Sequence, residues 1–168
     1  KRQVLSEKVF DDRRPEMYLN LPTNPYLWNP LDFFGLYGMN PLPKGKESLV
    51  SIVQMNTTNN LNQNLKEILK HLEIAKSNLS ELVVFPELAL TGHKNKNKSA
   101  ISKDSSEILQ LANYANKNNL YICCGFAEKE KKEFYNSSIL FGPEGILGIY
   151  RKIHLNNEDK KWASEGNE

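Results

Sequence analysis

The feature that most restricts the fold of this chain is a helical pattern between two short apolar runs. Residues 49–55 and 81–85 are apolar and rich in β-branched side chains, which is typical of buried strands. Between them, apolar residues recur at the spacing of one helical face, namely at Leu61, Leu65, Ile68, Leu69, Leu72 and Ala75. A strand, an amphipathic helix and a second strand in this order predict an α/β fold.

The same alternation continues along the rest of the chain. An apolar helical face around residues 108–115 precedes a third strand at 120–126. Two further strand-like runs, 137–141 and 146–150, flank the turn residues 142–145. The sequence therefore predicts a sheet that ends in a hairpin.

Residues 1–47 differ in composition from the rest of the chain. They hold six of the eight prolines and seven of the sixteen aromatic residues, without sustained strand or helix periodicity. Aromatic side chains gain much from burial, so this stretch is too aromatic for a solvated linker. We expect residues 1–47 to form a connector or strap from an upstream module, packed on a partner surface or on the α/β region at residues 48–168.

Charge and cysteine content exclude several classes of protein. The 168 residues suit one domain, and 22 basic against 20 acidic residues give a net charge of +2, which argues for neither nucleic acid nor a membrane. Cys123 and Cys124 are neighbours and cannot bridge each other on a strand, so we expect a reducing, cytoplasmic location. Phosphate-loop, dinucleotide, serine-hydrolase and zinc-protease motifs are missing, and His71, His93 and His154 share no ligand spacing. We therefore expect no cofactor and no metal.

Two short stretches are candidates for chemistry. Glu87 directly follows a buried strand, in the stretch Phe-Pro-Glu-Leu-Ala-Leu-Thr-Gly at residues 85–92, where α/β folds assemble their sites. Lys152 stands in the run at 150–155, where apolar neighbours would hold it partly buried beside an anion. Taken alone, Glu87 also fits a solvated loop residue, and Lys152 fits the basic end of an amphipathic strand.

Together with their surroundings, these stretches resemble the nitrilase, or carbon–nitrogen hydrolase, superfamily. The resemblance runs from about Ser48 through five blocks in the family's order. The blocks are residues 50–56, 82–92, 124–129, 135–145 and 150–155. Each block alone is a weak signal, whereas five blocks in the right order at natural spacings are a strong one.

The resemblance implies a fold and a set of site residues. Family members fold as an α-β-β-α four-layer sandwich, of which residues 48–168 would be the first half. They hydrolyse or condense non-peptide C–N bonds through a Glu-Lys-Cys triad. By motif, Glu87 matches the general base and Lys152 the triad lysine, and a second acidic residue falls near Glu158 or Asp159.

The nucleophile is the part of the triad that has no match. The family's cysteine lies a few tens of residues after the lysine, and no cysteine follows Lys152 in this chain. We expect the nucleophile beyond this chain, and we expect Cys123 and Cys124 to be buried small hydrophobes. The 168-residue chain alone would then be inactive.

Three hypotheses follow. The leading one is hydrolysis of a small amide-type substrate by the Glu-Lys-Cys mechanism. The alternative is a catalytically silent nitrilase-like scaffold or oligomerisation domain of a larger multidomain protein. The third is a covalent fusion behind a reverse transcriptase in phage defence, with nucleic acid bound only through that upstream module. We also expect a homo-oligomer formed through the sandwich and no membrane segment.

Overall fold

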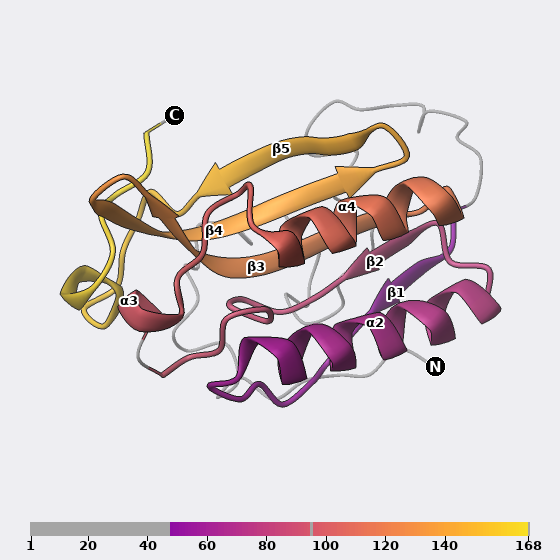
Figure 1. The fold of residues 1–168 in the computed structure, drawn as a ribbon, viewed down its shortest axis with the longest axis horizontal. Coiled ribbons are helices and arrows are strands. Elements are labelled where there is room, and N and C mark those ends of the chain that lie inside the picture. Colours follow the sequence, from indigo (N-terminus) through magenta and orange to yellow (C-terminus); the bar gives the residue numbers. More distant parts are fainter. Residues whose placement is uncertain (1–47, 95, 168) are drawn as a thin grey trace, which may run out of the picture. The chain divides into compact units, whose positions relative to one another are not determined.

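The structure is a computed structural model that describes residues 48–94 and 96–167 (Figure 1). The predicted order of strands and helices is observed, with one short helix and one 3₁₀-helix in addition. The predicted strap at residues 1–47 lies outside the described residues. The elements are β1 (Val50–Ile52), α2 (Leu61–Ser77), β2 (Leu82–Val84), α3 (Lys96–Ser99), α4 (Ser106–Asn118), β3 (Tyr121–Glu130), β4 (Glu133–Gly142), β5 (Gly145–Arg151) and the 3₁₀-helix η3 (Asp159–Lys161).

The five strands form one sheet in the order β1-β2-β3-β4-β5. β1, β2 and β3 run parallel, because α2 and α4 return the chain between them. β3, β4 and β5 are antiparallel neighbours, with Phe126 opposite Ser137 and Ser137 opposite Arg151. This α/β sheet with a terminal hairpin confirms the predicted fold class.

Strands β3 and β4 are longer than the apolar pattern predicts. The predicted strands end at residue 126 and resume at 137, whereas the observed ladder continues to the pair formed by Glu130 and Glu133. Lys131, with a φ of 54°, begins the short turn between them. Backbone pairing with β4 carries this extension, which also places Glu128 beside Arg151 of β5, and no local pattern indicates either contact.

Helices α2 and α4 cover one face of the sheet (Figure 1). Burying one aliphatic or aromatic side chain contributes about 1.5–3 kcal/mol, so the apolar cluster between helices and sheet is a core for this region. Alternate strand residues point into it, as the period of two requires. Its members include Leu65, Ile68, Leu72, Ala75, Val83, Ile108, Leu111, Ala115, Ile122, Cys124, Phe126, Ile139 and Phe141.

The opposite face of the sheet carries apolar side chains that the described residues leave open. Val50, Ile52, Leu140 and Tyr150 are each at least 38% exposed. One helical layer and one sheet layer are thus present, which is what the first half of an α-β-β-α sandwich contains.

Asparagines mark the ends of both long helices. The side chain of Asn60 caps α2 by accepting from the N–H of Gln63 (3.1 Å), as residues of this type do. Asn119 ends α4 in the left-handed conformation, with a φ of 51°. In the part of the chain that the structure describes, no helix is long and apolar enough to cross a membrane.

The segment after β2 packs directly on the backbone of β3. The N–H of Leu90 donates to the carbonyl of Gly125 (3.1 Å). A Cβ on Gly125 would lie 2.6 Å from the backbone nitrogen of Leu88 and 2.8 Å from Cα of Glu87. Leu88 itself has a φ of 52°, so the turn is tight. The missing side chain at residue 125 therefore sets the position of Glu87.

Gly125→Ala is expected to lower the free energy of unfolding by about 1–3 kcal/mol, because the added methyl group overlaps backbone atoms of the turn at residues 86–88. Gly148→Ala in β5 is the matched control, since no described atom lies within 4 Å of its Cβ position. Denaturant unfolding of the full-length protein, followed by circular dichroism, compares the two. Equal losses in both variants would contradict the role given to Gly125.

Candidate active site

Four polar side chains meet at one end of the sheet, and we call Glu87, Asn136, Lys152 and Asp159 the carboxylate–lysine cluster. Glu87 lies shortly after β2, Asn136 in β4, Lys152 directly after β5 and Asp159 at the start of η3. The Nζ of Lys152 donates to Glu87 Oε1 (3.1 Å) and to Asp159 Oδ2 (2.6 Å). The structure thus brings Glu87 and Lys152, the two residues singled out from the sequence, into direct contact.

Asn136 bridges the two carboxylates of the cluster. Its Nδ2 donates to Glu87 Oε1 (2.7 Å) and to Asp159 Oδ1 (3.3 Å). Its backbone carbonyl accepts from the N–H of Lys152 (2.8 Å). Sequence reasoning missed this residue. The sequence feature that could have indicated it is its place as a polar residue in one of the family blocks. The structure shows that this strand position is buried.

The structure brings Asp159 into the cluster and leaves Glu158 outside it. The Asn156 side chain accepts from the N–H of Asp159 (2.8 Å), which starts the η3 turn, and Asp159 is 4% exposed. The indole N–H of Trp162 donates to Asp159 Oδ1 (3.3 Å). Glu158 points to solvent and pairs with Lys161. Of the two acidic candidates, Asp159 is the one placed to act with Lys152.

Hydrogen bonds keep the groups of the cluster charged. Burial alone would raise the pKa of Glu87, but the hydrogen bonds from Asn136 and Lys152 outweigh it and lower that pKa. In the same way, the bond from Lys152 overcomes burial and lowers the pKa of Asp159. The bond to Asp159 is the main cause that raises the pKa of Lys152. Near neutral pH the cluster therefore holds two carboxylates and one ammonium group.

Neither cysteine of the chain contacts the cluster. Cys124 lies in the helix-facing core, where burial raises the pKa of its thiol and makes it a poor nucleophile. Cys123 points the other way, and its Sγ lies 3.3 Å from Ser138 Oγ. Among the described residues, no group of three or more His, Cys, Asp or Glu side chains could hold a metal ion.

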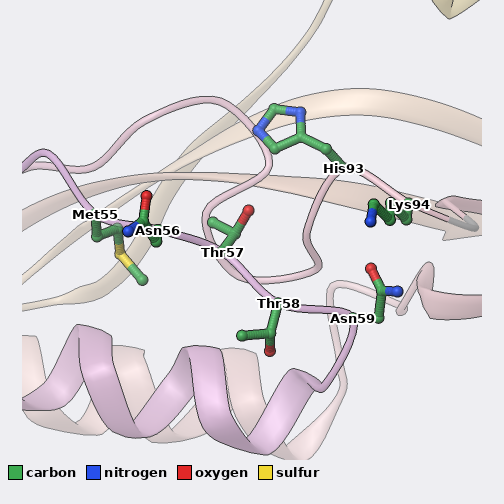
Figure 2. A pocket seen from close by; sticks show the side chains of 7 residues that line it. All are labelled: Met55, Asn56, Thr57, Thr58, Asn59, His93 and Lys94. Atoms are coloured by element: carbon green, nitrogen blue, oxygen red, sulfur yellow. The ribbon is translucent and has the colours of Figure 1, made fainter.

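A hollow of about 670 Å³ lies between the segment at residues 55–59 and the residues His93 and Lys94 (Figure 2). Close to it, the buried amide of Asn64 joins the segment before α2 to the segment after β2, by donating to the carbonyls of Thr58 (2.9 Å) and Leu90 (3.1 Å). Gly92 permits this approach, because a Cβ there would lie 2.2 Å from the carbonyl oxygen of Thr58. The lining side chains are Met55, Asn56, Thr57, Thr58, Asn59, His93 and Lys94.

Asp159→Asn is expected to destabilise the full-length protein by about 1–3 kcal/mol, because the buried partner of Lys152 loses its charge. Glu158→Gln is the control, and it should leave the unfolding midpoint unchanged, since Glu158 is solvent-exposed. Urea unfolding at neutral pH measures both. A larger loss from Glu158→Gln than from Asp159→Asn would contradict the assignment of the second acidic residue.

The cluster also predicts how stability depends on pH. A carboxyl group whose pKa is lowered by folding stabilises the folded state above its ordinary pKa, here 4.5 for Glu87 and 3.8 for Asp159. That stabilisation is lost as the pH falls through the lowered value. Between about pH 5 and pH 2, the wild-type unfolding free energy should fall more steeply than that of Glu87→Gln/Asp159→Asn. Urea unfolding at a series of pH values gives both slopes, and equal slopes would contradict the prediction.

Known proteins share this fold and sequence pattern. The family profile described as carbon-nitrogen hydrolase matches residues 49–167. Over 124 residues, the chain is 32% identical to a nitrilase of Pyrococcus abyssi, covering 70% of this chain and 47% of that protein. Over 89 residues, it is 35% identical to an (R)-stereoselective amidase of a Pseudomonas species, covering 51% and 30%.

Solved structures agree with the sequence matches. An N-terminal amidase with an Asn-Glu-Ala peptide superposes with a TM-score of 0.61 at 26% identity, covering 71% of this chain and 32% of the other. A carbon–nitrogen hydrolase superfamily protein of Xanthomonas campestris with an arsenic adduct in its active site superposes with a TM-score of 0.65 at 24% identity, covering 73% and 48%. The chain spans less than half the length of each of these relatives. The profile match and the shared fold show that the chain belongs to the carbon–nitrogen hydrolase, or nitrilase, superfamily.

Proposed function

We propose that this chain supplies the glutamate and lysine of a Glu-Lys-Cys site that hydrolyses a non-peptide C–N bond in a small amide-type substrate. The observation that supports it best is the contact of Lys152 Nζ with Glu87 Oε1 at 3.1 Å, beside a buried Asp159. By the sequence resemblance, these two residues match the glutamate and the lysine of the family's triad. An ionised carboxylate beside an ammonium group suits proton transfer next to a developing negative charge.

Glu87 is the general base in this proposal. It takes the proton of the cysteine thiol, and the sulfur attacks the substrate carbonyl carbon to form a C–S bond and an oxyanion. When the oxyanion collapses, the C–N bond breaks and Glu87 returns the proton to the leaving amine. A water molecule then attacks the thioester with Glu87 as base. The C–S bond breaks, the carboxylic acid leaves, and Glu87 gives the proton taken from water to the cysteine sulfur, which restores the thiol.

Lys152 has an electrostatic role. Its ammonium group favours the thiolate and the oxyanion, because both are anions that form close to it. Asp159 and Asn136 orient it, through the side chain of Asp159 at 2.6 Å and the backbone carbonyl of Asn136 at 2.8 Å. A lysine held on two sides loses little orientational freedom when the charge develops.

The cysteine is proposed to lie in sequence beyond Glu168. Two facts support this: no cysteine follows Lys152 in the chain, and the chain spans 47% of the nitrilase it matches. A homo-oligomer formed through the sandwich, a covalent upstream fusion and a cytoplasmic location remain predictions.

Glu87→Gln in the full-length protein is expected to lower kcat by about 10²–10⁴-fold, because the amide keeps the shape of the side chain but cannot take a proton. Ammonia release from a panel of small primary amides and nitriles measures the loss. Glu144→Gln is the matched control, since Glu144 is exposed in the turn between β4 and β5, and it should keep the wild-type rate. Wild-type turnover by Glu87→Gln would reject the assignment of Glu87 as the base, whereas no turnover by the wild-type protein on any substrate of the panel would favour the scaffold alternative.

A further inference from the structure

A buried carboxylate lies on the face of the sheet opposite the carboxylate–lysine cluster. Glu128 of β3 is 1% exposed, and both of its oxygens accept from the guanidinium of Arg151. Nη2 of Arg151 donates to Oε1 (2.6 Å), and Nε donates to Oε2 (2.8 Å). Ser137 Oγ also donates to Oε2 (2.7 Å). This bidentate, charge-assisted pair has a well-defined geometry.

The two residues that donate to Glu128 are adjacent in sequence to residues of the cluster. Ser137 follows Asn136 in β4, and Arg151 precedes Lys152 at the end of β5. Successive side chains of a strand point to opposite faces. Each strand therefore presents one side chain to Glu128 and the next to the cluster, and the bond from the N–H of Lys152 to the carbonyl of Asn136 joins the strands at this level.

Further contacts hold Arg151 and its backbone. Its Cζ lies 4.0 Å from the ring centre of Tyr135. Its Nη1 also lies 3.2 Å from Oε2 of Glu130, but the Glu130 side chain is 45% exposed, so water screens this pair and it holds Arg151 only weakly. The N–H of Gly166 donates to the carbonyl of Lys152 (3.0 Å). A Cβ on Gly166 would lie 2.3 Å from the carbonyl oxygen of Arg151. The end of β5 is thus held through both its side chain and its backbone.

Stability alone is a weak reason for burying this ion pair. Removing two charges from water is costly, and an apolar pair of similar volume often stabilises a core equally well. A bidentate guanidinium–carboxylate contact, in contrast, fixes the orientation of two planar groups. The ends of β4 and β5 must be held in a fixed orientation, because Asn136 and Lys152 contact Asp159 at 3.3 Å and 2.6 Å.

We propose that Glu128 and Arg151 are positioning residues of the hydrolase site, which hold the ends of β4 and β5 so that Asn136 and Lys152 contact Glu87. Neither residue belongs to the cluster: Arg151 acts through its bonded neighbour Lys152, and Glu128 acts through its side-chain contacts with Arg151 and Ser137. The expected effect on kcat rests on the proposed function. The expected effect on the contacts of Asn136 and Lys152 with Glu87 does not.

Glu128→Gln in the full-length protein is expected to lower kcat by about 10–100-fold with KM nearly unchanged, because the reacting groups lose alignment rather than substrate contacts. Looser bonds from Asn136 and Lys152 would also let the pKa of Glu87 rise toward 4.5. Since the base must be ionised, the acid limb of the kcat/KM profile should move to higher pH. The assay uses a primary amide that the wild-type protein hydrolyses.

Two variants separate positioning from general charge effects. Glu130→Gln removes the exposed carboxylate on the same guanidinium, and it should keep wild-type kcat and pH profile. Arg151→Lys keeps the charge but loses the bidentate contact, so it should lower kcat, as Glu128→Gln does. Arg151→Met loses both the charge and the contact, so it should lower kcat further. Thermal unfolding establishes that each variant is folded, and Arg151→Lys provides the test if Glu128→Gln does not fold.

A titration that needs no turnover distinguishes this inference from the proposed function. The ¹³C carboxyl signal of Glu87, assigned by its loss in Glu87→Gln, reports its pKa in the full-length protein. A higher Glu87 pKa in Glu128→Gln, but not in Glu130→Gln, supports positioning even if Glu87→Gln keeps full activity. A folded Glu128→Gln or Arg151→Lys protein with wild-type Glu87 titration and wild-type kcat would overturn it.

Discussion

The ammonium group of Lys152 joins segments that are far apart in the chain. It bonds to Glu87, 65 residues away, and to Asp159, seven residues away. Two carboxylates at one place repel each other, and without a cation between them one would take up a proton. The hydrogen bond to Asp159 raises the pKa of Lys152 above its ordinary value of 10.5, so the group at this position is a cation at neutral pH. The loop after β2, the end of β5 and η3 therefore share one electrostatic centre.

The contacts on the two faces of the sheet depend on each other, because they involve neighbouring residues of the same strands. On the open face Asn136 and Lys152 meet the carboxylates, while on the helix face their neighbours Ser137 and Arg151 close around Glu128. A one-residue shift of either strand would exchange the two sets of side chains. The cluster therefore forms only in this register of β4 and β5. The ion pair of Glu128 and Arg151 on the helix face is one of the contacts that fix that register.

Features with a local signature could be predicted from the sequence, and those that depend on distant partners could not. Glu87 and Lys152 adjoin apolar strands within family blocks, and the helical face of α2 repeats clearly. The choice between Glu158 and Asp159 depends on how the Asn156 side chain starts the η3 turn. The extension of β3 past residue 126 depends on pairing with residues 133–136 of β4, and a run of charged residues gives no strand signal by itself. Arg151, the partner of Glu128, lies 23 residues later in the chain.

The hydrogen bonds to Glu87 matter more for its ionisation when its side chain is buried more deeply. Its side chain is 52% exposed among the described residues, whereas in the α-β-β-α arrangement of this superfamily a second sheet packs on the open face. Such a layer would remove water from the cluster, which favours the protonated carboxyl and raises the pKa of Glu87. The same layer would strengthen the bonds from Asn136 and Lys152, because a lower dielectric strengthens charge-assisted bonds. The two donors would therefore oppose the rise in the pKa of Glu87 as burial increases, and an ionised carboxylate is what a base needs at neutral pH.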